Sequence, residues 1–260
     1  MSFPFKLGAK KPTFYKHMPS FKDLPSFNLP KAPPRLDRSG INPAPQMFNN
    51  DKIGDCTAAG VANAALAFSA LNGFYPVIDT ASVVNFYSAT SGYVPGNPNT
   101  DQGADPTAVL TYLARNGFKA PNETLVALFG MISTEDRNAL GNVMNIAGVV
   151  YGAFAMTLSD QYAVSNGYPL DIASPGDQTP YSWGGHLMDI WSYEGLEDSD
   201  RVWLLTWGQI YPTTWRWIES RMVAAYGVLF RQLLDVTGHN QLKQDWGSMI
   251  TQTKNFISTL

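Results

Sequence analysis

Apolar residues recur with helical spacing in the first part of the chain. Residues 56–71 are apolar on most faces, which is typical of a helix in the middle of a domain. Residues 80–89 predict a second helix. A third is predicted after Asp105, because Asp105 suits an N-cap, Pro106 suits the first helical position and Gly117 suits the residue just past the end.

Strand-like patterns follow residue 147. Three runs rich in β-branched and aromatic residues are bounded by Gly, Pro or Asp, which indicates strands: GVVYGAFAM (148–156), GGHLMDIWSY (184–193) and RVWLLTW (201–207). Further helical segments are expected to start at 133–136 and to occupy 213–222 and 240–257. Helices first and strands later predict an α+β fold. The expected units are a helical lobe at about 50–145, a sheet lobe at about 146–230 and a C-terminal helix at about 240–258.

Residues 1–45 differ from the rest and predict an extended arm. Nine of the eighteen prolines lie there, so neither a helix nor a central strand is expected. Residues 1–40 also carry eight Lys and Arg against two Asp, whereas residues 41–260 carry ten basic and nineteen acidic groups. Such an arm could lie on its own body, on an acidic partner or on nucleic acid. Nucleic acid is the weakest of these, because no binding motif accompanies the lysines.

Composition excludes several classes of site. A single cysteine excludes an internal disulfide, and no Cys/His cluster suggests zinc or calls for another cofactor. No signal peptide and no membrane-spanning stretch are expected from the apolar pattern. The simplest expectation is a soluble protein made in a reducing compartment.

Cys56 and His186 are the candidate catalytic pair. A cysteine at a helix N-terminus can have a lowered pKa, and as a nucleophile it needs a base nearby. His186 follows Gly184 and Gly185 at the start of a predicted strand. Each residue alone is more often a buried core residue than a catalytic one. Their separation of 130 residues lies in the range of nucleophile and base in papain-like proteases.

These residues and their surroundings resemble the papain-like cysteine peptidase superfamily over residues 45–225, and most closely a branch found in bacteria and bacteriophages. The shared features are Gly54 two residues before Cys56, GGHLMDIWSYEG around His186, and LLTWGQ at 204–209. The resemblance implies a papain-like two-lobe fold over 46–260, with a helical lobe built around the Cys56 helix and an antiparallel sheet lobe. It also implies that Asn50, in the place of the family's glutamine, acts as the oxyanion donor.

The third catalytic position departs from the family. Leu205 stands where the family has the asparagine that orients the histidine. Thr206 is the candidate substitute, although neighbouring strand residues point to opposite faces. The resemblance therefore implies a Cys-His pair whose supporting residues are altered, and weak or vestigial activity.

Two functions remain open. The preferred one is a structural protein of a bacteriophage virion, associated with the capsid or tail and attached through the arm, with Phe14, Phe21 and Phe27 buried against a partner. The alternative is an active intracellular cysteine peptidase acting on a peptide substrate. Location in the virion or the host cytoplasm is expected, with no membrane partner.

Overall fold

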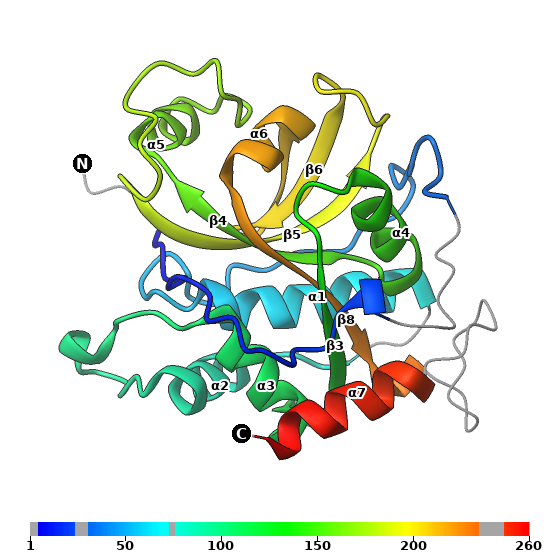
Figure 1. Ribbon diagram of the computed structural model, residues 1–260. Helices are drawn as coiled ribbons and strands as arrows, with labels where there is room; N and C mark the ends of the chain where they lie inside the picture. The colour runs from blue at the N-terminus through cyan, green and yellow to red at the C-terminus, as the bar shows by residue number, and fades with distance from the viewer. Residues whose placement is uncertain (1–4, 24–30, 73–75, 234–246, 260) are drawn as a thin grey trace.

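A six-stranded antiparallel sheet forms one half of the protein (Figure 1). The structure is a computed structural model, which describes residues 5–23, 31–72, 76–233 and 247–259. The strands lie in the order β3-β8-β4-β5-β6-β7. They are β3 (Ala127–Ile132), β4 (Val150–Met156), β5 (Gly184–Tyr193), β6 (Arg201–Thr206), β7 (Gln209–Thr214) and β8 (Met222–Phe230). A separate small hairpin pairs β1 (Phe118–Lys119) with β2 (Thr124–Leu125).

Helices lie on both sides of the sheet (Figure 1). The α-helices are α1 (Cys56–Asn72), α2 (Thr80–Ser91), α3 (Pro106–Asn116), α4 (Arg137–Ala147), α5 (Leu158–Ser165), α6 (Trp215–Arg221) and α7 (Gly247–Ser258). Helices α1, α2, α3 and α7 lie on one side of the sheet, and α4, α5 and α6 lie on the other. Short 3-10 turns occur at Phe21–Asp23, Pro98–Thr100 and Arg231–Leu233. Within the described part of the chain, no helix is long and apolar enough to cross a membrane.

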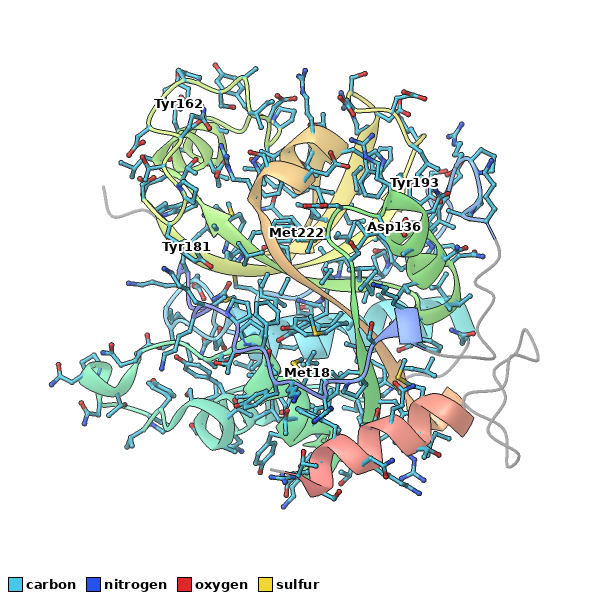
Figure 2. All side chains as sticks on the ribbon, viewed as in Figure 1. Met18, Asp136, Tyr162, Tyr181, Tyr193 and Met222 are labelled. Carbon is cyan, nitrogen blue, oxygen red and sulfur yellow. The ribbon has the colours of Figure 1, made fainter. Side chains whose placement is uncertain are left out.

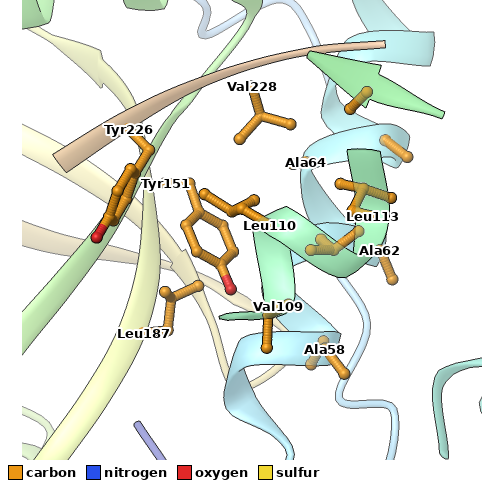
Figure 3. Packing of buried hydrophobic residues seen from close by; sticks show 14 of the residues in the cluster. Ala58, Ala62, Ala64, Val109, Leu110, Leu113, Tyr151, Leu187, Tyr226 and Val228 are labelled. Carbon is orange, nitrogen blue, oxygen red and sulfur yellow. The ribbon is translucent and has the colours of Figure 1, made fainter. Parts of the chain in front are cut away.

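The buried helix α1 packs directly on the sheet. Its alanines face α3 on one side, and Leu187 of β5 and Tyr151 of β4 lie close by (Figure 3). Gly60 permits the close approach, because a Cβ there would lie 2.2 Å from a methyl group of Leu187. The N-terminus of α1, which begins at Cys56, is thereby held against the start of β5.

The α+β prediction is confirmed, and most predicted elements lie within a few residues of the observed ones. Asp105 caps α3 by accepting a hydrogen bond from the Thr107 N–H, and Gly117 follows the helix with a positive φ of 73°. The prediction of a helical lobe over all of 50–145 is wrong at β3, which pairs with β8 in the sheet. Short apolar runs such as ALFGMI do not distinguish a strand from a buried helix by periodicity. Residues 240–246 of the predicted C-terminal helix lie outside the described residues.

The described part of the arm packs on the body instead of departing from it. Ser20 pairs with Met131 of β3, and Leu36 pairs with Tyr193 of β5. Phe21 is only 4% exposed and its ring lies on the backbones of β3 and β8. The prediction that Phe21 is buried against a partner is therefore wrong, since this chain's own core contains it. Phe14 is 55% exposed, and Phe27 lies outside the described residues.

Phe21→Ala is expected to destabilise the protein by about 3–5 kcal/mol, the usual cost of removing a buried phenylalanine. The cavity would open against Gly130 and Gly227, whose lack of side chains makes room for the ring. Phe14→Ala is the matched control and should change stability by less than about 0.5 kcal/mol. Urea denaturation followed by tryptophan fluorescence measures both. Equal stability of the two variants would contradict this placement of Phe21.

Candidate active site

Cys56 lies at the N-terminus of α1 and is 2% exposed. The carbonyl of Asp55 accepts the first hydrogen bonds of the helix, from the N–H groups of Ala58 and Ala59. Burial raises the pKa of the Cys56 thiol to about 12, although backbone N–H groups of Leu187, Gly8 and Thr57 act in the opposite direction. In this conformation the sulfur is therefore a neutral thiol. The N–H of Leu187 also shows that the sulfur lies beside the residue that follows His186.

His186 is held on two sides and left without a partner on the third. Its Nε2 lies 2.8 Å from the Thr206 hydroxyl, and its ring stacks on Trp207 with 4.3 Å between centroids. Its Nδ1 is buried and has no hydrogen-bond partner among the described residues. Burial lowers the pKa of His186 to about 3, so the ring is neutral at pH 7. This ring could accept one proton at Nδ1 without losing its contact to Thr206.

The structure brings Thr206, and not Leu205, to the histidine. The two residues alternate on β6, so Thr206 faces His186 while Leu205 joins the apolar cluster that contains Cys56 and Leu187. The resemblance implies that residue 205 takes the histidine-facing side, but residue 206 takes it. The side chain that contacts the imidazole is thus a hydroxyl.

Asn50 lies close to the cysteine, as the resemblance implies. Both residues line a small cavity of about 10 Å³, together with Thr206 and Trp207, which is about the space of one water molecule. The Asn50 side-chain N–H donates to the carbonyl of Ile53 at 3.2 Å. This bond holds the turn before Cys56 and uses one of the two amide protons, and the same amide lies close enough to the Asp55 carboxyl to lower its pKa.

Residues 5–10 of the arm lie across these groups. The N–H groups of Gly8 and Ala9 donate to the carbonyl of Gly185 at 3.1 and 3.0 Å. On the other side, Ala104 donates to the carbonyl of Gly8 at 2.8 Å and accepts from the N–H of Lys10 at 2.9 Å. The arm therefore forms backbone hydrogen bonds both to the residue before His186 and to the loop before α3.

Side chains hold the same segment at both ends. Phe5 stacks on Trp207 with 4.9 Å between centroids, and the Lys11 ammonium lies 5.1 Å from the Tyr181 ring centroid. Figure 1 shows the arm in blue from residue 5 onward, crossing the molecule towards β3, and Figure 2 labels Tyr181 and Met18 along the path of the arm. The sequence does not predict that residues 5–10 lie at the site. The only local signal was a pair of small residues, Gly8 and Ala9, between an aliphatic residue and two lysines.

Comparison with solved structures shows which fold this chain has. No protein-family model matches the sequence, and no curated protein sequence matches it. Among solved structures, xylellain, a cysteine protease from Xylella fastidiosa, is similar with a TM-score of 0.63 at 16% identity, over 87% of this chain and 96% of its own. ProCathepsin B S9 from Trypanosoma congolense gives a TM-score of 0.60 at 10% identity, over 87% of both chains. The digestive procathepsin L2 proteinase of Tenebrio molitor gives 0.59 at 15%, over 87% of this chain and 78% of its own.

The protein has a papain-like fold. Within that fold, Cys56 begins the central helix and His186 lies at the start of β5. No group of three or more His, Cys, Asp or Glu side chains in the described part of the chain could hold a metal ion.

Asp55 is a second buried titratable group, next to Cys56 in the sequence. Its side chain is fully buried, and burial raises its pKa to about 8 although the nearby Asn50 amide acts in the opposite direction. An acid whose pKa is raised on folding stabilises the folded state fully at pH values below its unfolded pKa. That stability is lost as the pH rises towards the folded pKa.

Asp55→Asn is therefore expected to flatten the fall in the free energy of unfolding between pH 6.5 and 8. The slope removed is at most about 1.4 kcal/mol per pH unit, the value for one proton. Asp79→Asn is a suitable control, because Asp79 caps α2 and its pKa is lowered, so its protonation changes only at acid pH. Urea denaturation at several pH values measures the slopes. An unchanged slope in Asp55→Asn would contradict a neutral, buried Asp55.

Proposed function

We propose that the protein is a cysteine peptidase of the papain type whose cleft is closed by its own residues 5–10. The observation that carries the proposal is the placement of Cys56 and His186. The cysteine begins the central helix, and its sulfur lies beside the N–H of Leu187. His186, the residue before Leu187, contacts the Thr206 hydroxyl through Nε2, and its Nδ1 has no hydrogen-bond partner among the described residues. A nucleophile next to a base that is itself oriented by a third group is the arrangement that thiol catalysis requires.

Each residue then has a role in hydrolysis. The Cys56 sulfur attacks the substrate carbonyl carbon while His186 Nδ1 takes the thiol proton. His186 later gives a proton to the leaving amine, and water releases the acyl group from the sulfur. Thr206 acts as a positioning residue through Nε2. The Cys56 N–H and the Asn50 amide are the donors proposed for the oxyanion, and the amide would turn from Asp55 to the oxyanion.

The closed state is inactive for two physical reasons. The arm directs the N–H of Gly8 towards the sulfur, while the Gly8 carbonyl is bonded to the Ala104 N–H. The segment thus occupies the cleft without offering its carbonyl to the oxyanion donors. Burial under the arm also keeps Cys56 and His186 neutral, with pKa values of about 12 and about 3. Displacing the arm exposes both groups to water, which lowers the thiol pKa and raises the imidazole pKa.

Attachment to an assembly, such as a virion, is the second candidate. What favours it is Phe14, a large apolar side chain of the arm that is 55% exposed. Phe21 does not support this attachment, because it is buried in this chain's own core. The two functions are compatible, since an assembly protein can retain a catalytic site.

The peptidase proposal is tested by labelling Cys56 with a thiol-directed peptidyl epoxide and measuring intact mass. The full-length Gly8→Val protein is used, because a side chain at residue 8 is expected to displace the arm. We expect epoxide labelling and hydrolysis of fluorogenic peptides, both lost in Cys56→Ala. Adding His186→Ala should abolish epoxide labelling while iodoacetamide still alkylates Cys56. If the protein with His186→Ala were labelled by the epoxide as well as before, the thiol would be merely exposed and would not act with His186 as a catalytic pair.

A further inference from the structure

The cleft has no room for a side chain at the residue that lies over Cys56. A Cβ built on Gly8 would lie 1.8 Å from the carbonyl oxygen of Gly54 and 2.6 Å from its Cα. These atoms are backbone, and they precede the catalytic helix by two residues. The obstruction therefore cannot be relieved by turning a flexible side chain away.

Two further glycines lie equally close to the arm, Gly103 beside Ala104 on one side and Gly185 on the other. A Cβ on Gly103 would lie 2.2 Å from the Gly8 carbonyl oxygen, and one on Gly185 would lie 2.1 Å from the Ala9 carbonyl oxygen. Gly103 has a positive φ of 69°, which further favours glycine there. Three glycines, Gly54, Gly103 and Gly185, thus let both walls approach the backbone of whatever lies between them.

The neighbouring positions are less restricted. Ala9 is 7% exposed, so a small residue fits beside Gly185. Leu7 packs beside Gly184, where a Cβ would lie 3.1 Å from the leucine side chain. Lys10 is exposed. The hydrogen bonds to Gly185 and Ala104 come from backbone groups, so any extended peptide could form them.

We propose that this cleft selects peptides with glycine at the residue over Cys56, flanked by a small residue and an aliphatic one. Gly54 and Gly103 are the specificity-determining residues. The limit comes from the backbone of Gly54, which no side-chain movement can relieve. The claim that such peptides are substrates rests on the proposed peptidase function. The claim that the cleft binds them does not.

The experiment measures protection of Cys56 in the full-length Gly8→Val protein. The octapeptide FKLGAKKP, residues 5–12, is added in trans, and the rate of alkylation by iodoacetamide is followed by intact mass. The same peptide with alanine in place of its glycine is compared with a control peptide that has alanine at the position of Lys10. Protection by the parent and the control peptide is expected at similar concentrations. The glycine-substituted peptide should need a concentration at least roughly tenfold higher.

Equal protection by the glycine and alanine peptides would overturn the inference, as would a folded, reactive Gly8→Val protein that the parent peptide does not protect. Should Gly8→Val lack the near-ultraviolet circular dichroism of a folded protein, Gly8→Ala takes its place in the same assay. Because protection needs no turnover, absent hydrolysis alone contradicts the peptidase proposal and leaves the glycine selection standing.

Discussion

A chain that begins at Ile41 is expected to lose its cooperative fold. The deleted segment contains Phe21, whose ring fills the space over β3 and β8. It also contains Leu36, which pairs with Tyr193 at the end of β5. Removing the phenylalanine contact alone costs about 3–5 kcal/mol. The total stability of a domain is only about 5–15 kcal/mol.

Arg38 adds the strongest reason. It is 6% exposed, lies over the Trp191 ring at 4.3 Å, and donates to the carbonyls of Met144, Trp191 and Gly148. Deleting it leaves three carbonyl groups at the end of α4 and on β5 without this donor. Each unsatisfied buried acceptor costs about 1–3 kcal/mol. The arm is therefore part of the domain's own structure.

Circular dichroism and urea denaturation measure the effect. A chain that begins at Phe5 is the control, because it retains every described contact, and it should unfold as the full chain does. A chain beginning at Ile41 that keeps native near-ultraviolet circular dichroism and a cooperative transition would show that the arm is dispensable for folding.

Gly8→Val is expected to raise the rate of Cys56 alkylation at pH 7 by at least about 100-fold. With a pKa of about 12, roughly one thiol in 100,000 is ionised at pH 7 in the closed state. A valine at residue 8 cannot fit against the Gly54 backbone, so the arm must leave the cleft. Exposure to solvent removes the burial that raises the pKa, and the thiolate fraction increases.

Gly40→Ala is the matched control, because a Cβ at residue 40 meets nothing within 4 Å. It should alkylate as slowly as the unmodified protein. The alkylation is quenched at a series of times and followed by intact mass, which reports on Cys56 alone because it is the only cysteine in the sequence. A Gly8→Val protein that alkylates no faster than Gly40→Ala would mean that the arm does not control access to the thiol.

The local features of the fold could be predicted from the sequence. The caps of α3 follow from the preferences of Asp105, Pro106 and Gly117, and the apolar run from Cys56 predicts a buried helix. Helix caps and helix faces depend only on residues that are close together in the sequence. The prediction that Cys56 and His186 act as a pair required the family resemblance, because periodicity does not tell which strand lies beside which helix.

The remaining features depend on long-range register. Whether Leu205 or Thr206 faces His186 is set by how β6 pairs with β5, where a shift of one residue exchanges the two faces. The docking of residues 5–10 rests on backbone hydrogen bonds to Ala104 and Gly185, which leave no periodic pattern in the sequence. Proline and lysine content indicated an extended arm, but could not indicate the surface on which it lies.

The most direct test of the closed cleft is amide hydrogen exchange of residues 5–11, measured by mass spectrometry on the unmodified protein. The N–H groups of Gly8, Ala9 and Lys10 are bonded to Gly185 and Ala104 and should be protected for minutes or longer. The same peptide should exchange rapidly in Gly8→Val, while peptides from α1 remain protected in both proteins. Complete exchange of residues 5–11 within seconds in the unmodified protein would contradict a cleft sealed by the arm.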